Sequence, residues 1–208
     1  MNTADRYVPD WLDVSRETLA ALVELEALVL KWTTTVNLIS KTSALDIWGR
    51  HMLDSAQIAK LVTAKGSDWA DLGSGGGFPG LVLAVIGREI WPQRRFTLVE
   101  SDARKAAFLA QANKTLGLNV TILVQRVEAL SPLSAHSVTA RALAPLEVLL
   151  GFAHRHLRTG GKAYFPKGAT YRQEVEAARI KWQFEEIAHV SRTDPQSAIL
   201  EVKNIDPR

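Results

Sequence analysis

The fold is decided by the stretch Asp71-Leu72-Gly73-Ser74-Gly75-Gly76-Gly77-Phe78-Pro79-Gly80. It follows a short apolar run at residues 69–72 and precedes an apolar helical run at residues 81–86. Five glycines fall within eight positions, although a tight turn needs only one or two. So many glycines indicate positive φ angles or a close approach of the backbone to a ligand. Ligands of α/β sheets bind beside the carboxyl ends of strands, so we expect a ligand-binding loop here.

Downstream of this loop, short apolar runs alternate with helical segments. We expect strands at residues 69–72, 96–99, 120–124, 137–140 and 162–165, and helices at 81–86, 104–116, 146–157 and 174–180. The pair Gly160-Gly161 is expected to end the helix at 146–157. Residues 184–190 and 198–202 are expected to form a closing antiparallel pair. This alternation predicts an α/β fold with a parallel sheet and right-handed crossovers.

The amino-terminal part has a different pattern. Apolar residues recur at helical spacing from 15 to 36, with Asp13 or Ser15 as the N-cap. Residues 37–40 break the pattern, a second helix is expected at 45–62, and residues 65–67 are expected to turn. We therefore predict an amino-terminal helical extension, 1–66, that packs on a ligand-binding domain, 67–208, as one integrated unit.

Composition narrows the class of protein. With 47% hydrophobic and 23% charged residues, the 208-residue chain can bury a core. It has no cysteine, which excludes disulfides, thiolate zinc sites and a cysteine nucleophile. His154 and His156 are too close in sequence to share one helix face, so we expect no metal. We find no secretory signal and no apolar stretch of about 18 residues, and therefore expect a cytoplasmic protein without a membrane partner.

Charge is distributed unevenly along the chain. Residues 1–68 contain 7 Lys and Arg against 9 Asp and Glu, whereas residues 69–208 contain 18 against 13. A basic carboxy-terminal part suits a polyanionic partner, because each cation that neutralises a phosphate releases counterions. The same balance is common among proteins that bind no nucleic acid, so it favours an RNA partner only mildly.

Two kinds of ligand fit the glycine loop. A dinucleotide fingerprint can be formed from Gly75, Gly77 and Gly80, but its first glycine then falls three residues after Leu72 instead of directly after the strand. The other pattern, acidic-x-Gly-x-Gly from Asp71, suits a ligand with a cationic amino-acid tail and no phosphate. S-adenosylmethionine is such a ligand. We expect it to contact Asp71, Gly73, Gly75 and Gly77, while an NAD-dependent oxidoreductase remains the alternative.

Two acidic residues near later strand ends are further candidates. Glu100 closes the second expected strand, where a carboxylate can accept both hydroxyls of a ribose. Glu128 follows the third strand and could reach an adenine edge. For Glu100 the ribose contact is favoured over an ordinary solvated charge, whereas for Glu128 the two interpretations are equally good.

The combination of motifs resembles the RsmG (GidB) family of ribosomal RNA methyltransferases. The resemblance runs from about residue 37 to the end of the fifth strand, and rests on Asn37-Leu38, Arg50-His51-x-x-Asp54-Ser55, the run 71–80, Arg126-Val127-Glu128, Ala140-Arg141-Ala142 and Lys167-Gly168. The sequence departs from the family pattern at Gly76, where many relatives have proline, and at Glu100, often aspartate. Thr139 replaces a common serine. None of these changes removes a needed chemical group.

The resemblance implies a class I, Rossmann-like methyltransferase that uses S-adenosylmethionine. It implies methyl transfer to N7 of the guanine at position 527, in the 530 loop of 16S ribosomal RNA, so the expected partner is that RNA or the small ribosomal subunit. The cofactor contacts that it implies are Gly73, Phe78, Val127, Glu128 and Arg141.

The chemistry of the chain is compatible with N7 as the acceptor. Methylation of pyrimidine carbon-5 usually needs a cysteine, which is absent. Exocyclic amines usually meet an Asn/Asp-Pro-Pro-aromatic loop after the fourth strand, where this chain has Thr139-Ala140-Arg141-Ala142. Guanine N7 already offers a lone pair, so the enzyme has only to orient it.

We therefore assign roles to the cations near the loop. Arg141, Arg126 and His51 are expected to orient the guanine. Arg50, Lys167 and Arg88 are expected to bind RNA, and the protein is expected to be a monomer. A small-molecule methyltransferase and an RNA-binding module without activity stay open as alternatives.

Overall fold

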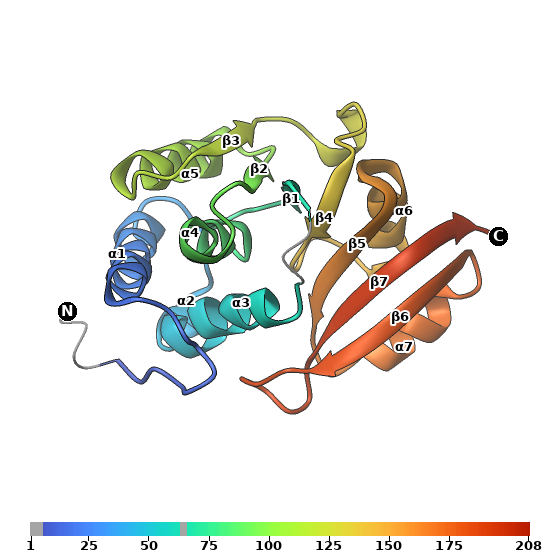
Figure 1. The fold of residues 1–208 in the computed structure, drawn as a ribbon, viewed down its shortest axis with the longest axis horizontal. Coiled ribbons are helices and arrows are strands. Elements are labelled where there is room, and N and C mark those ends of the chain that lie inside the picture. Colours follow the sequence, from blue (N-terminus) through green and yellow to red (C-terminus); the bar gives the residue numbers. More distant parts are fainter. Residues whose placement is uncertain (1–5, 63–65) are drawn as a thin grey trace.

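A seven-stranded sheet with the order β3-β2-β1-β4-β5-β7-β6 runs through the molecule (Figure 1). The computed structural model describes residues 6–62 and 66–208. The strands are β1 Asp68–Leu72, β2 Arg95–Val99, β3 Val120–Leu123, β4 Ala135–Thr139, β5 Leu157–Lys167, β6 Trp182–Val190 and β7 Ala198–Pro207. The first five are parallel, and β7 pairs antiparallel with both β5 and β6. The predicted α/β class and the closing antiparallel pair are confirmed.

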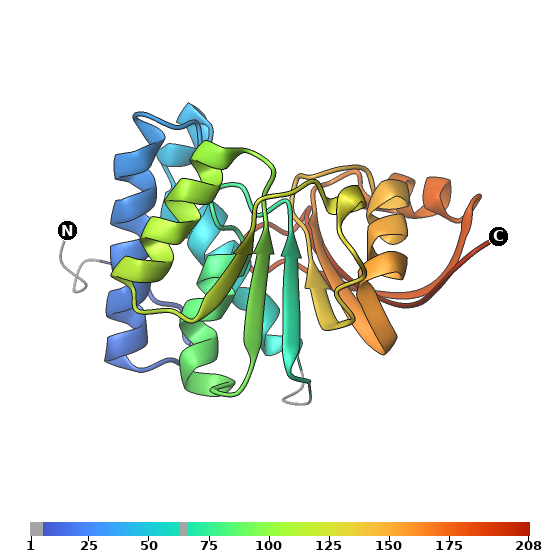
Figure 2. The same ribbon diagram turned by 90° about the horizontal axis from the view of Figure 1, so that it is seen from above.

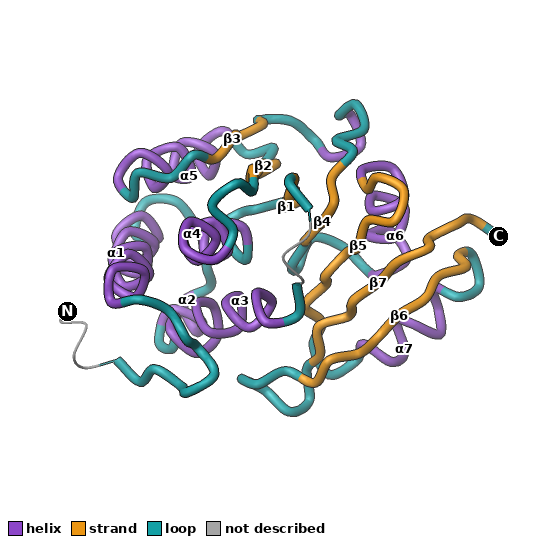
Figure 3. The backbone as a smooth tube through the Cα atoms, in the orientation of Figure 1, coloured by secondary structure: helices purple, strands orange, loops and turns teal. Residues whose placement is uncertain are grey.

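Helices cover both faces of the sheet (Figure 2). Alternate residues of a strand point to opposite faces, so Trp69 and Ala70 of β1 belong to different hydrophobic clusters. The helices are α1 Arg16–Thr33, α4 Gly80–Ile90 and α5 Ala103–Thr115 on the Trp69 face, and α6 Leu146–His156 and α7 Tyr171–Ala178 on the Ala70 face. Figure 3 shows β5, β7 and β6 as long strands on the side of the molecule away from α1. No described helix is long and apolar enough to cross a membrane.

The amino-terminal extension is helical, but its second helix differs from the prediction. Ser15 caps α1, because its Oγ accepts the backbone N–H of Thr18 at 3.1 Å. The second helix begins at residue 41 instead of 45, because Ser40 Oγ accepts the N–H of Ser43 at 3.1 Å and starts a turn there. It consists of α2 Lys41–Ala44, the π-helix η2 Trp48–Leu53, α3 Asp54–Ala56 and the 3-10 helix η3 Gln57–Lys60. Apolar spacing does not reveal such changes of hydrogen-bond pattern. The predicted turn at 65–67 lies partly outside the described residues.

The glycine pair after α6 has a different role from the predicted one. The helix ends at His156 and the chain enters β5 directly at Leu157. Gly160 has a φ of +74° inside β5, where the register with β4 shifts. Positive φ suits a strand irregularity as well as a helix end, which is why the sequence pattern was misleading.

The extension packs on the rest of the protein through a common core. One hydrophobic cluster joins Leu22 and Leu25 of α1, Met52 of η2, Leu83 of α4 and Trp69 of β1. Their side chains are all buried. The division at residue 66 stays a prediction, but the two parts exclude water from the same interior.

Candidate functional site

The glycine loop takes the backbone conformation that its composition predicts. Gly73, Gly75 and Gly77 have φ angles of +66°, +54° and +86°. A Cβ at Gly73 would lie 2.6 Å from Leu143 Cδ1, a distance that real Cβ atoms do not show. Ser74 N donates to Val99 O at 2.9 Å and ties the loop to the end of β2. The loop therefore needs glycine both for its φ angles and for space.

A cavity of about 530 Å³ lies over this loop, within the size range of small-molecule sites. Its walls come from the chain after β1, β2, β3 and β4, all at the carboxyl edge of the parallel sheet. Nine of the predicted site residues meet there: His51, Gly73, Gly75, Phe78, Glu100, Arg126, Val127, Glu128 and Arg141.

Glu100 is held firmly at the edge of this cavity. Its Oε2 accepts the N–H of Gly75 at 2.8 Å, and its Oε1 accepts the N–H of Asp102 at 2.7 Å. Only 7% of the residue is exposed. The carboxylate thus lies between the glycine loop and the start of α5, as expected for a residue that receives a ribose.

Asp71 and Gly77 do not line the cavity. Asp71 Oδ1 accepts from Thr139 Oγ1 at 2.7 Å, because the two residues pair between β1 and β4, and Oδ2 accepts from Gly80 N at 3.2 Å. Burial raises the pKa of Asp71 to about 6. A Cβ at Gly77 would lie 2.5 Å from Leu81 Cδ1. Asp71 and Gly77 therefore stabilise the turn that leads into α4 and do not face the cavity.

Arg141 stands at the centre of a polar cluster. Its Nη2 lies 2.6 Å from His51 Nδ1, and its Nη1 donates to Arg50 O at 3.2 Å and Asp54 Oδ2 at 3.4 Å. The guanidinium carbon lies 5.1 Å from the centre of the Phe78 ring, on which His51 also stacks, with a centroid separation of 4.9 Å. Burial, with the cations Arg141 and Arg50, lowers the pKa of His51 to about 3. Neutral His51 therefore accepts a hydrogen bond from Arg141.

A second cavity of about 630 Å³ adjoins the first. Arg141 and residues 142–144 line both cavities, so the chain after β4 is their common wall. Ala142 in this wall has a φ of +54°, which is unusual for a residue with a side chain. The remaining lining residues are Asp54, Pro145, Pro166, Lys167, Gly168, Glu174, Ser191, Ser197 and Ala198.

The three predicted RNA contacts lie in different places. Lys167 lines the second cavity, but its side chain is only 9% exposed and its Nζ donates to Glu174 Oε2 at 2.8 Å. Arg50 is exposed and lines a third hollow of about 560 Å³ beside η2. The structure brings both close to Arg141.

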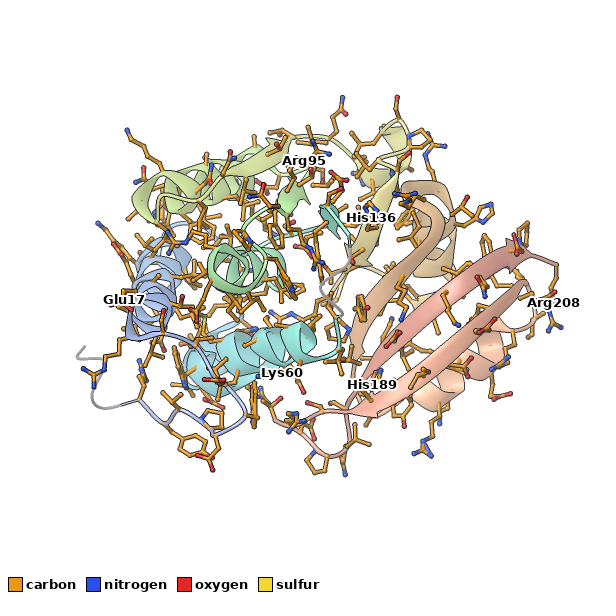
Figure 4. All side chains as sticks on the ribbon, in the orientation of Figure 1. Glu17, Lys60, Arg95, His136, His189 and Arg208 are labelled. Carbon is orange, nitrogen blue, oxygen red and sulfur yellow. The ribbon has the colours of Figure 1, made fainter. Side chains whose placement is uncertain are left out.

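Arg88 is not part of this region. It lies in the last turn of α4, and because α4 returns the chain to the start of β2, it is near the opposite edge of the sheet. Its Nη1 donates to Leu116 O at 2.8 Å. That edge carries ion pairs of its own: Asp68 contacts Arg95 at 2.6 Å and His136 at 3.5 Å, and Figure 4 labels the two basic residues.

Sequence reasoning missed part of the polar cluster. From the sequence, Asp54 is identified only as part of the motif Arg50-His51-x-x-Asp54-Ser55, whereas in the structure its carboxylate faces Arg141 and also accepts from Gln57 and Thr193. Thr193 is 139 residues away along the chain, so no local pattern could reveal it. Among the described residues, no group of three or more His, Asp or Glu side chains could hold a metal ion.

The first cavity suits S-adenosylmethionine better than a dinucleotide. The N–H of Gly75, which would serve a phosphate, already donates to the Glu100 carboxylate. A pyrophosphate beside this carboxylate would be repelled, whereas ribose hydroxyls and a cationic tail would not. Apolar walls for an adenine ring are provided by Val99, Val127, Val148 and Phe152.

Known structures share this fold. The T. thermophilus 16S rRNA N2 methyltransferase RsmC, in complex with AdoMet and guanosine, superposes with a TM-score of 0.52 at 16% identity, over 72% of this chain and 38% of that chain. M. jannaschii TYW2 in complex with AdoMet gives 0.53 at 13% identity, over 73% and 74%. At such low identity, the similarity concerns the fold alone.

The sequence comparisons are more specific. A protein named ribosomal RNA small subunit methyltransferase G from Cereibacter sphaeroides is 50% identical over 203 residues, which cover 98% of each chain. A protein of the same name from Ruegeria pomeroyi is 46% identical over 200 residues, covering 95% of this chain and 98% of the relative. The family model described as rRNA small subunit methyltransferase G matches residues 18–199. The chain therefore belongs to the rRNA small subunit methyltransferase G (GidB) family, and it is a methyltransferase that uses S-adenosylmethionine.

Proposed function

We propose that this chain transfers a methyl group from S-adenosylmethionine to N7 of a guanine in the 530 loop of 16S ribosomal RNA. The first cavity holds the methyl donor, with Glu100 at the ribose and residues 126–128 at the adenine. When bound, the donor supplies an electrophilic methyl group already activated by its sulfonium. The residues of the chain then have to align the acceptor atom with that group and exclude water.

One observation carries the choice of N7: among the described residues, the two carboxylates that line the second cavity, Asp54 and Glu174, and the neighbouring His51 are already engaged in hydrogen bonds. Asp54 already accepts from Arg141, Gln57 and Thr193. Glu174 accepts from Lys167 Nζ and from Leu146 N, both at 2.8 Å. His51 has its pKa lowered to about 3. An exocyclic amine must lose a proton when it is methylated, whereas N7 reacts through a free lone pair.

Arg141 is the orienting cation in this proposal. A guanidinium commonly donates to O6 and N7 of guanine together, but a donor on N7 would occupy the reacting lone pair. We therefore assign Arg141 to O6 or to a neighbouring phosphate, at the boundary between the two cavities. The second cavity receives the target base after it leaves its stack.

The test is to locate the methyl group. Protein, S-adenosylmethionine with a labelled methyl group, and 16S ribosomal RNA or small subunits from cells that lack this protein are incubated, and the RNA is digested to nucleosides. We expect the label in 7-methylguanosine, mapped to one position. Label in N2-methylguanosine or in any adenosine would overturn the N7 assignment, and a comparison of naked RNA with subunits identifies the substrate form.

We further propose that the protein acts in the cytoplasm as a monomer. One copy of the chain provides the glycine loop, Glu100 and Arg141 around the first cavity, which is compatible with a monomer. Analytical ultracentrifugation should give a mass near 22.9 kDa, with and without S-adenosylmethionine.

A further inference from the structure

One carboxylate joins three distant parts of the chain beside Arg141. Asp54 is the first residue of α3, in the amino-terminal extension. Its Oδ2 lies 3.4 Å from Arg141 Nη1, after β4. Its Oδ1 accepts from Gln57 Nε2 at 2.9 Å and from Thr193 Oγ1 at 3.1 Å, and Thr193 belongs to the loop between β6 and β7, residues 191–197.

The 191–197 loop is itself fastened to the extension. Gln57, only 3% exposed, donates through Nε2 to Ser191 Oγ at 3.0 Å and accepts the N–H of Arg192 through Oε1 at 2.8 Å. Ser191 Oγ also accepts the N–H groups of Thr193 and Asp194 at 3.2 and 3.3 Å. The loop therefore cannot move away from Asp54 without breaking several hydrogen bonds at once.

The contact between Asp54 and Arg141 contributes little to the stability of the fold. The side chains of Arg141 and Asp54 are 16% and 20% exposed, and their closest approach of 3.4 Å is long for an ion pair. Partly exposed ion pairs of this kind contribute little to folding stability. For the alignment of a reacting group, by contrast, a displacement of about 1 Å can lower the rate roughly a hundredfold.

Arg141 keeps a donor, its Nε, with which it can bind a substrate. Asp54 and Arg50 O hold its Nη1, and His51 holds its Nη2. Within the described residues, its Nε donates no hydrogen bond. The side chain lines both cavities, so Arg141 is within reach of a molecule bound in either one.

We infer that Asp54 and Thr193 are positioning residues, which fix the direction of the Arg141 guanidinium for methyl transfer. The inference rests on the proposed function. In this inference Asp54, although it lines the second cavity, acts through Arg141. The carboxy-terminal hairpin of β6 and β7 thereby takes part in the reaction, although its strands lie outside the parallel sheet that carries the cofactor cavity.

A double-mutant cycle tests the inference. The variants Asp54→Ala, Arg141→Ala and the double variant are compared in the transfer of labelled methyl groups to the ribosomal substrate. Asp54→Ala should lower kcat at least tenfold, with the S-adenosylmethionine Kd unchanged within twofold. In the Arg141→Ala background the same change should alter kcat less than twofold. An equal tenfold drop in both backgrounds would mean that Asp54 acts on the substrate or the fold directly, and would overturn the inference.

A second pair of variants tests the positioning role if Arg141→Ala is too slow to measure or if Asp54→Ala does not fold. Thr193→Val removes the hydroxyl that bonds to Asp54, and Thr193→Ser keeps it. We expect Thr193→Val to lower kcat at least threefold, Thr193→Ser to keep the wild-type kcat, and both to melt within about 4 °C of the wild type. Equal kcat values for the two variants would contradict the positioning role.

Failure of this inference is distinguishable from failure of the proposed function. Total transfer of label does not depend on which RNA atom is methylated, so a product other than 7-methylguanosine leaves the cycle interpretable. If no RNA is methylated at all, nitrogen-15 NMR of the Arg141 Nε in the free protein gives the answer. Its signal should broaden or shift in Thr193→Val and stay unchanged in Thr193→Ser, and identical signals in both would overturn the inference.

Discussion

Gly73 combines two requirements that other residue types cannot meet together. Its φ of +66° disfavours any residue with a Cβ, and a Cβ there would lie 2.6 Å from Leu143 Cδ1 in the wall of both cavities. Gly117 offers a natural comparison, because it has a φ of +59° but nothing within 4 Å of an added Cβ.

We expect Gly117→Ala to cost about 1–2 kcal/mol of folding free energy, the usual price of the left-handed conformation. Gly73→Ala should cost more than this and should also weaken S-adenosylmethionine binding at least tenfold, because Leu143 must move. Denaturant unfolding and calorimetric titration measure the two effects. If Gly73→Ala and Gly117→Ala lost equal stability and Gly73→Ala still bound S-adenosylmethionine normally, Leu143 would be shown to move without affecting the cavity.

Glu100→Gln tests the assignment of the ribose. The amide keeps the size of the side chain but replaces one acceptor oxygen with a donor, which opposes the N–H of either Gly75 or Asp102. We expect the Kd for S-adenosylmethionine to rise at least tenfold by calorimetry. Asp102→Asn is the matched control, because it alters the cap of α5 beside Glu100 without changing the cavity wall, and its Kd should stay within threefold.

His51 should make the stability of the protein sensitive to acid. Its pKa in the folded protein is lowered to about 3 from 6.5, so below pH 6.5 the unfolded chain binds a proton that the folded chain does not. Stability from this source is complete above pH 6.5 and is lost as the pH falls toward 3. His51→Asn keeps an acceptor for Arg141 and does not titrate.

The difference in unfolding free energy between wild type and His51→Asn should therefore fall by roughly 1 kcal/mol from pH 7.5 to pH 5.5. Urea denaturation at the two pH values measures it, and groups common to both proteins cancel in the difference. A difference independent of pH would place the pKa of His51 near its ordinary value.

The sequence alone identified most residues of the cofactor cavity, because they directly follow strands that are easy to recognise. Asp71 and Gly77 were grouped with these contacts, but they lie beneath the loop. A one-residue step along a strand end reverses the side-chain direction, and spacing does not show which direction is taken. The contact of Asp54 with Arg141 spans 87 residues, so it depended on the tertiary fold.

Whole elements were easier to predict than their ends. The alternation of apolar runs predicted every strand of the sheet. It did not predict the order of β5, β7 and β6, because strand order depends on long-range pairing. One helix was predicted at 45–62, whereas the structure has four helical pieces between Lys41 and Lys60. The π-helix η2 carries Arg50 and His51. The irregular backbone hydrogen bonding therefore occurs in the part of the extension that contributes side chains to the candidate site.

The contact between α1 and α4 depends on a few polar groups. Ser15 Oγ caps α1 and donates to Glu89 Oε2 at 2.9 Å, and Thr18 Oγ1 donates to the same oxygen at 2.6 Å. We expect Ser15→Ala to destabilise the protein by about 1–2 kcal/mol, because it removes the cap and one link to α4. Ser15→Thr keeps the hydroxyl and should stay within about 0.5 kcal/mol of the wild type in chemical denaturation. Equal losses in the two variants would exclude the hydroxyl as the cause.

At the scale of the whole molecule, the shared core predicts a single unfolding transition. Leu25 and Val29 of α1 are fully buried in the same cluster as Leu83 of α4. If the extension cannot detach alone, hydrogen exchange should protect the central amides of α1 and β1 with the same free energy. Protection of α1 lower by more than about 2 kcal/mol would instead define residues 1–66 as a separate folding unit.

The hydrogen-bond network around Arg141 has a consequence for the synthesis of the protein on the ribosome. The guanidinium takes its partners Arg50, His51 and Asp54 from the amino-terminal extension, and Asp54 in turn accepts from Thr193 in the 191–197 loop. Translation proceeds from the amino-terminal to the carboxy-terminal end, so a nascent chain can complete this hydrogen-bond network only after the 191–197 loop has been synthesised. A transcript truncated after β5 would encode a chain without Thr193, so the Asp54 carboxylate beside Arg141 would lack one of its hydrogen-bond donors.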